Sequence, residues 1–221
     1  MNIKLFSNHK QQVDSIVEHL KQKIKHKLNT SESIIIAVSG GKSPIELFKK
    51  ISVADLPFNR IFFTLIDERI ISTDSADSNE NLVKKNLLIN SATKSRFLGL
   101  YKGINDNLEI QRNLNNINFK IDIGILGMGE DGHFASIFKC SKEYESLIAL
   151  NNKEKYLLVN PTSVPYQRIS LTLRSVLEIP ELILSINGIK KLNILKDINQ
   201  SLPIHHLLKN RFDIPVFWYE I

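Results

Sequence analysis

The chain has 221 residues, of which 43% are hydrophobic and 24% are charged, and its net charge is +6. These are globular values, and no apolar run approaches the roughly 18 to 20 residues that a membrane span requires. We therefore expect one domain covering residues 1–221, without a membrane-spanning segment.

The excess of basic residues does not predict a nucleic-acid partner. The lysines are scattered among abundant asparagine and isoleucine instead of forming one basic stripe. A basic protein suits an anionic small substrate better. The N-terminal segment lacks a hydrophobic signal core, and the single Cys140 cannot form a disulfide within the chain, which favours a cytoplasmic location.

Predicted strands and helices alternate along the chain. Apolar side chains recur at helical spacing from residue 11 to residue 28, and the isoleucine-rich segment 33–38 is typical of a buried strand. This alternation indicates a Rossmann-like α/β fold, with a largely parallel sheet and helices on both faces. The predicted helices are 11–28, 45–51, 80–89, 105–115, 189–197 and 205–209, and the predicted strands are 33–38, 61–66, 121–126, 156–159, 169–173, 181–186 and 215–219.

Ligands of such sheets bind beyond the carboxyl ends of the strands, and three predicted strands end in polar or glycine-rich segments. The first is the turn Gly40-Gly41-Lys42-Ser43, which precedes a helix. Free amides, two side-chain donors and the positive helix end make this turn a candidate for binding phosphate or carboxylate. The spacing of a Walker A loop is absent.

A second predicted strand ends at Asp67-Glu68-Arg69. The planar guanidinium of Arg69 is suited to grip an oxyanion, although an ordinary ion pair with a neighbouring carboxylate is an equally good interpretation. Adjacent residues of an extended segment point to opposite sides, so Asp67 and Glu68 are not predicted to act as a catalytic pair.

The third strand end is the loop Gly127–His133, whose glycines Gly127, Gly129 and Gly132 can turn amides toward an oxyanion. Although the spacing matches a dinucleotide fingerprint, polar residues flank the third glycine, which disfavours that interpretation. Imidazole titrates near neutral pH, so His133 is the candidate general base. The spacings of a zinc site and of a serine hydrolase are absent, so no metal is predicted.

Together these segments resemble the 6-phosphogluconolactonase family of the sugar-phosphate isomerase superfamily. The turn at 39–44 is similar to the family's SGGSTP loop, Asp67-Glu68-Arg69 with Asp77-Ser78-Asn79 to its DER and DSN motifs, and residues 127–136 to its GMGxDGHTAS signature. Three later segments, which contain Arg168, Lys191 and Trp218, follow in the family's order. The chain departs from the pattern at Lys42, Ser43, Phe134 and Lys139 and in the segment 161–165.

This resemblance implies hydrolysis of 6-phospho-D-glucono-1,5-lactone in the oxidative pentose phosphate pathway, without a cofactor. His133 would take a proton from the attacking water, Asp131 would orient or stabilise the imidazole, and loop amides or Asn79 would stabilise the oxyanion. The resemblance offers the Gly40-Gly41 loop, Arg69, Arg168 and Lys191 for the 6-phosphate without ranking the three cations. The partner is a small phosphorylated sugar lactone, and the sequence predicts no oligomeric state, a monomer being compatible with it.

Two other functions stay open at this stage. A glucosamine-6-phosphate deaminase shares the broad fold, but its family has DEY in place of Asp67-Glu68-Arg69 and an FNEP run where this chain reads Ala135-Ser136-Ile137-Phe138. A sugar-phosphate sensor would bind the same ligand without turnover. The segment before Ser33 has room for little beyond one helix, which argues against a DNA-binding regulator.

Overall fold

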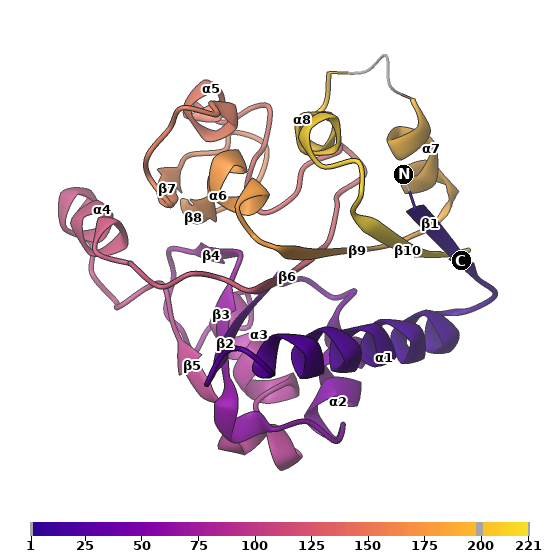
Figure 1. The fold of residues 1–221 in the computed structure, drawn as a ribbon. Helices are drawn as coiled ribbons and strands as arrows, with labels where there is room; N and C mark the ends of the chain where they lie inside the picture. The colour runs from indigo at the N-terminus through magenta and orange to yellow at the C-terminus, as the bar shows by residue number, and fades with distance from the viewer. Residues whose placement is uncertain (1, 198–200, 221) are drawn as a thin grey trace.

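A seven-stranded parallel sheet runs through the centre of the computed structural model, which describes residues 2–197 and 201–220 (Figure 1). Neighbouring strands run in the same direction throughout, which confirms the predicted α/β fold class with a largely parallel sheet. Across the sheet the order is β1 (Asn2–Phe6), β10 (Pro215–Tyr219), β9 (Glu181–Asn187), β6 (Ile123–Leu126), β2 (Ile34–Val38), β3 (Ile61–Leu65) and β5 (Arg96–Leu98).

Helices cover both faces of this sheet. In Figure 1, α1 (His9–Leu28), α2 (Ile45–Ser52) and α3 (Asn79–Asn86) lie below it, and α5 (Tyr144–Ile148), α6 (Leu173–Leu177), α7 (Ile189–Lys196) and α8 (Pro203–Asn210) lie above it. The apolar face of α1 carries Val13, Ile16, Leu20 and Ile24, all buried at the spacing that predicted the helix. None of the helices in the described part of the chain is long and apolar enough to cross a membrane.

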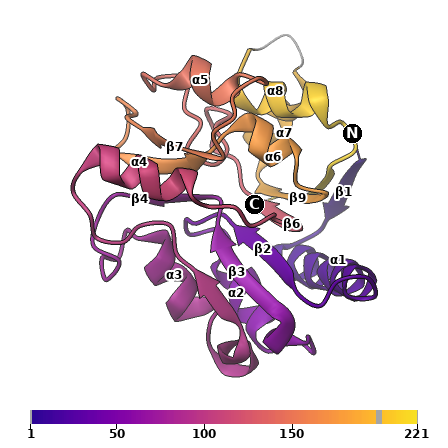
Figure 2. The ribbon, with the colours of Figure 1, turned by 60° about the vertical axis from the view of Figure 1, so that its left-hand side comes forward.

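A second, antiparallel sheet lies beside the first one and was not predicted. It consists of β4 (Asp67–Arg69), β8 (Arg168–Leu171) and β7 (Tyr156–Val159), with α4 (Asn107–Asn115) packed against β7 (Figure 2). Because β4 follows β3 after one residue, this small sheet is attached directly to the carboxyl edge of the large one. It therefore forms a wall beside the edge at which ligands are expected.

The predicted boundaries agree with the structure within two residues, except the end of the predicted helix 80–89, which differs by three. The predicted strand 169–173 ends at Leu171 because the Thr172 side chain accepts a hydrogen bond from the Ser175 amide and caps α6. The predicted helix 80–89 ends at Asn86, and a 3-10 helix follows at Asn90–Lys94. The predicted strand 121–126 begins at Ile123, since the Asp122 side chain accepts a hydrogen bond from Ile35 N. The short elements β1, β5, α5 and α6 and the 3-10 helix Phe58–Arg60 were not predicted.

Main-chain hydrogen bonds join the carboxyl ends of three central strands. The amide of Ser39, after β2, donates to Ile125 O at 3.0 Å, and the amide of Ile66, after β3, donates to Val38 O at 3.0 Å. The segments that follow β2, β3 and β6 consequently start side by side, and they carry the polar motifs that the sequence singles out.

Candidate active site

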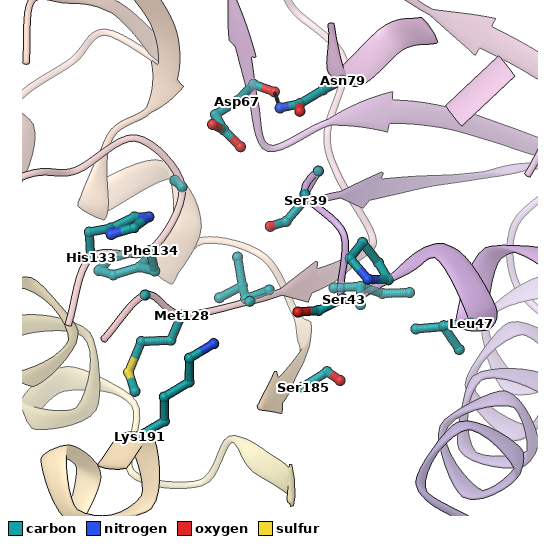
Figure 3. Close-up of a pocket in the computed structure, with 18 of the residues that line it drawn as sticks. Ser39, Ser43, Leu47, Asp67, Asn79, Met128, His133, Phe134, Ser185 and Lys191 are labelled. Atoms are coloured by element: carbon teal, nitrogen blue, oxygen red, sulfur yellow. Dashed lines mark hydrogen bonds between the residues drawn. The ribbon is translucent and has the colours of Figure 1, made fainter. Parts of the chain in front are cut away.

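A cavity of about 190 Å³ opens at this carboxyl edge (Figure 3). Its wall is built from the segments after β2, β3 and β6, from β8 and from the region of β9 and α7. Ten of the residues proposed from the sequence line it: Gly40, Gly41, Ser43, Arg69, Asn79, Gly127, Gly129, His133, Arg168 and Lys191.

Three proposed site residues lie outside the cavity wall. The side chain of Lys42 is exposed, since the turn presents its neighbours Gly41 and Ser43 to the cavity instead. Asp131 reaches the site only through its contact with His133. Gly132, at φ 74°, provides the left-handed turn of the loop, and a side chain there would collide with Leu202.

Other lining residues were not proposed as part of the site. Asp67 is 5% exposed and accepts a hydrogen bond from Ser136 Oγ at 2.6 Å through Oδ2. Ser185 is a polar residue within the apolar strand β9, and this interruption is the signal that identifies it. Phe134, Met128 and Leu47 supply apolar surface, for which the sequence gives no signal that separates them from ordinary core residues.

His133 is held in place by two neighbours. Its Nδ1 atom lies 2.5 Å from Oδ1 of Asp131, and its ring stacks on Phe138 with the centroids 4.1 Å apart. The hydrogen bond with His133 lowers the pKa of Asp131, so that side chain is a carboxylate at neutral pH. Within the described residues Nε2 of His133 has no protein partner. It is the ring atom left to accept a proton.

Gly129 makes the contact between Asp131 and His133 sterically possible. A Cβ atom at residue 129 would lie 2.3 Å from Nδ1 of His133 and 2.6 Å from Oδ1 of Asp131. The amide of Gly129 donates to His133 O, and the amide of Gly132 donates to Gly129 O. These two proposed oxyanion donors are therefore already bonded within their own loop.

The turn after β2 approaches Asn79 just as closely. A Cβ atom at Gly40 would lie 1.9 Å from Oδ1 of Asn79. Asn79 is 2% exposed and donates through Nδ2 to the Asp67 carbonyl at 2.7 Å. In the described structure the amides of Gly40 and Gly41 donate to no protein acceptor. Together with the Ser39 hydroxyl, which is buried without a partner, they are free to bind a ligand.

Arg69 and Arg168 face each other across the β4–β8 ladder. Residues directly opposite in an antiparallel pair share a face, and like charges there repel. Neither guanidinium has an ion pair with a carboxylate among the described residues, and Nε of each arginine is buried without an acceptor. Burial and the charge of Arg69 lower the pKa of Arg168. The pair is therefore a concentrated positive charge in the cavity wall; the carboxylates of Asp67 and Glu68 favour the charged form of Arg168 without forming an ion pair with it in the described structure.

Glu68 points away from the cavity, as expected for the residue next to Asp67 in a strand. It is fully buried and accepts hydrogen bonds from the amides of Arg69, Asn79 and Glu80 and from Ser78 Oγ. Glu68 thereby bonds to the backbone on both sides of the loop 70–78. The alternative of an Arg69 ion pair with Asp67 or Glu68 is absent from the described structure, since only the Arg69 amide contacts Glu68.

Lys191 lies at the other end of the cavity. Figure 3 shows Lys191 and Ser185 at one end, Asp67 and Asn79 at the opposite end, and His133 on the side between them. Ser43 and the N-terminus of α2 lie close to the lysine end. Burial lowers the pKa of Lys191, whose ammonium has no protein partner within the described residues.

The cavity thus combines a titratable base with three cationic side chains and one lining carboxylate, Asp67. Such a balance fits a small ligand that carries an anionic group at one position and develops negative charge at another.

The chain is similar to known proteins over nearly its whole length. The family model described as glucosamine-6-phosphate isomerases/6-phosphogluconolactonase matches residues 7–216. The 6-phosphogluconolactonase of Helicobacter pylori (strain ATCC 700392 / 26695) is 36% identical over 93% of this chain and 92% of its own length. The enzyme of that name from Pseudomonas aeruginosa is 29% identical over 99% and 95%. The crystal structure of a 6-phosphogluconolactonase from Shewanella baltica superimposes with a TM-score of 0.87, at 26% identity, and covers 100% of this chain and 97% of that one.

Proposed function

Because the chain belongs to the family of glucosamine-6-phosphate isomerases and 6-phosphogluconolactonases, we propose that it hydrolyses 6-phospho-D-glucono-1,5-lactone to 6-phospho-D-gluconate. It is a hydrolase related over most of its length to enzymes named 6-phosphogluconolactonase. The observation that carries the proposal is His133, which lines the cavity and is held at Nδ1 by Asp131. In this role the protein acts in the oxidative pentose phosphate pathway.

The proposed reaction needs one base and one site for an oxyanion. Nε2 of His133 takes a proton from a water molecule, whose oxygen attacks C1 of the lactone. The carbonyl oxygen becomes an oxyanion, and when the bond from C1 to the ring oxygen breaks, the imidazolium returns its proton to that oxygen. Asp131 favours the imidazolium formed between these steps.

The arginine pair is the best-supported candidate for the oxyanion. Phe138 stacks on His133 and also contacts the guanidinium of Arg168, which lies 5.2 Å from the ring centroid. Arg168 therefore lies near the base, and Arg69 is its cross-strand neighbour. Their buried, unpartnered Nε–H groups can donate to an oxyanion, whereas the amides of Gly129 and Gly132 are occupied.

We assign the 6-phosphate to the lysine end. Lys191 contributes a cation, Ser43 and Ser185 contribute hydroxyls, and the amides of Gly40 and Gly41 are free near the positive end of α2. Lys42 has no part in this assignment, because its side chain lies outside the cavity. In this arrangement the phosphate binds at the lysine end and C1, whose carbonyl oxygen becomes negative during the attack, lies near His133.

The test is the rate at which freshly generated lactone disappears at slightly acidic pH, where spontaneous hydrolysis is slower. We expect acceleration by the wild type, a 10²- to 10⁴-fold loss in His133→Asn, and little change in calorimetric binding of 6-phosphogluconate. His26→Asn, at an exposed position of α1, is the control. Near-normal turnover in His133→Asn would exclude the base role.

The family model also covers isomerases, so glucosamine 6-phosphate is the second substrate to assay. A folded wild type that leaves the lactone rate unchanged and releases ammonia from glucosamine 6-phosphate is a deaminase. Binding of 6-phosphogluconate with neither activity identifies a sensor.

A further inference from the structure

The two cavity arginines are close in the ladder and repel each other, so each needs other contacts to keep its position. Arg168 rests against Phe138 and donates through Nη2 to the Pro165 carbonyl at 3.3 Å. Arg69 donates through Nη1 to the Asp77 carbonyl. The position of Arg69 therefore depends on where the loop 70–78 places Asp77.

One side chain from outside that loop fixes Asp77. The hydroxyl of Tyr166 donates to Oδ2 of Asp77 at 3.0 Å. This hydrogen bond raises the pKa of Tyr166, so the hydroxyl stays protonated and remains a donor. Since Asp77 uses its carbonyl for Arg69 and its carboxylate for Tyr166, a movement of either partner is passed to the other.

The backbone around Tyr166 is unusual. Tyr166 has φ 72°, a left-handed conformation that non-glycine residues rarely adopt and that persists only when surrounding contacts hold it. The residues on either side bond to the arginine region as well, because Pro165 O accepts from Arg168 and Gln167 O accepts from the Ile70 amide at 2.8 Å. The segment 165–167 thus contacts the surroundings of both arginines.

We propose that Tyr166 is a positioning residue, which holds Arg69 in the cavity wall through its hydrogen bond to Asp77. The Tyr166 side chain is 43% exposed and does not line the cavity, so it touches no substrate. Only the catalytic consequence rests on the proposed lactone hydrolysis; the coupling between Tyr166 and Arg69 is a property of the folded chain.

The direct test follows the Nε–H resonance of Arg69 by nitrogen-15 NMR, assigned by its loss in Arg69→Lys. Tyr166→Phe removes only the hydroxyl, and we expect it to shift or broaden this resonance. Tyr101→Phe is the matched control, because the Tyr101 hydroxyl donates to Oδ1 of Asn105 at a distance of 3.3 Å. This hydrogen bond lies away from the cavity. An unchanged Arg69 resonance in folded Tyr166→Phe overturns the proposal, whatever the protein hydrolyses.

A double-mutant cycle tests the consequence for catalysis. Tyr166→Phe should lower kcat/KM for the lactone about three- to tenfold in the wild type, which is the size expected from one hydrogen bond. In an Arg69→Ala background the same substitution should have no further effect, because its target is gone. Equal losses in both backgrounds contradict the role. Absence of lactone hydrolysis in the wild type refutes the proposed function instead. The coupling between Tyr166 and Arg69 is then tested by the NMR experiment alone.

Discussion

Nδ1 of His133 lies 2.5 Å from Oδ1 of Asp131, a residue whose side chain is 59% exposed. Solvent screens such a pair, so its effect on catalysis should be smaller than in a buried triad. We expect Asp131→Asn to lower kcat about tenfold, a much smaller loss than in His133→Asn. The assay is lactone hydrolysis at saturating substrate, and equal rates for Asp131→Asn and the wild type would show that the carboxylate contributes nothing.

The same pair predicts a pH dependence of stability. The hydrogen bond from His133 lowers the pKa of Asp131 below its ordinary value of 3.8. The stabilising contact is therefore complete above 3.8 and is lost as pH falls through the lowered value. The stability that Asp131 contributes should therefore be present at neutral pH and decrease in acid, and Asp131→Asn should lack this decrease. Melting temperatures of both proteins between neutral and acidic pH measure it, and an identical pH dependence in the two would contradict the arrangement.

Gly40 supports Asn79 by leaving room for it. The Cβ of Gly40→Ala would lie 1.9 Å from Oδ1 of Asn79, and the Asn79 side chain would have to leave its bond to Asp67 O. We expect roughly a tenfold or larger loss of kcat/KM, with a melting temperature lowered by a few degrees. Gly103→Ala is the control, since it is strained at φ 75° but has open space around its Cβ and lies away from the cavity. It should lose stability and keep activity.

Lys191 predicts a pH dependence of ligand binding. Burial lowers its pKa from 10.5, so the ammonium loses its proton before an ordinary lysine would. Affinity for 6-phosphogluconate should fall as pH rises toward 10.5, while the stability contribution of this residue rises over the same interval because the unfolded chain binds more protons there. Calorimetric titration at neutral and alkaline pH measures the affinity.

Two variants at this position, and one beside it, separate charge from structure. Lys191→Gln should weaken product binding about tenfold to a hundredfold at neutral pH, and Lys191→Arg should keep its affinity at alkaline pH because a guanidinium stays charged. Lys190→Gln is the control, since Lys190 is exposed and contacts Glu130 at 3.6 Å. Comparable losses at positions 190 and 191 would argue for a diffuse electrostatic effect.

Local sequence patterns predicted the parts of this site that depend on local structure. Apolar strands with polar ends placed Gly40, Arg69 and His133 at one edge of a parallel sheet, and the structure places all three in one cavity. Strand β4 has three residues, too few for a periodicity, and its antiparallel pairing with β8 is a long-range register. Local sequence patterns therefore could not predict the Arg69–Arg168 pair or the small sheet that holds it. Arg168 was proposed as a site residue only because of the family resemblance.

The hydrogen-bond partners of individual atoms could not be predicted from the sequence either. Nothing in the sequence indicates that the amides of Gly129 and Gly132 bond within their own loop, or that Lys42 lies outside the cavity. Both follow from which side of a turn each group occupies, and one positive φ value changes that side. Glycine motifs locate a site, but the donors that remain free in it have to be read from the fold.

Glu68 is expected to stabilise the fold around the loop 70–78. This buried carboxylate accepts four hydrogen bonds, three from amides and one from Ser78 Oγ. Burial raises its pKa above 4.5, and these hydrogen bonds oppose that rise. Glutamine has the same shape as glutamate, but the NH₂ group in Glu68→Gln faces N–H donors. At least one buried donor therefore loses its acceptor, at a cost of about 1–3 kcal/mol.

For a chain of this size each kcal/mol corresponds to about 2–4 °C in melting temperature, so calorimetry should detect the loss in Glu68→Gln. Because the pKa of Glu68 is higher in the folded chain than in the unfolded chain, the folded wild type loses stability as pH rises and this carboxyl group ionises. The neutral glutamine of Glu68→Gln causes no such loss. The stability difference between wild type and variant should therefore be larger at mildly acidic pH than at neutral pH. The control is Glu178→Gln, whose side chain is 62% exposed and pairs with Arg174 on the surface. A Glu68→Gln variant as stable as this control would mean that the amide bonds of Glu68 do not hold the loop 70–78, and with it Asn79 and Arg69, in place.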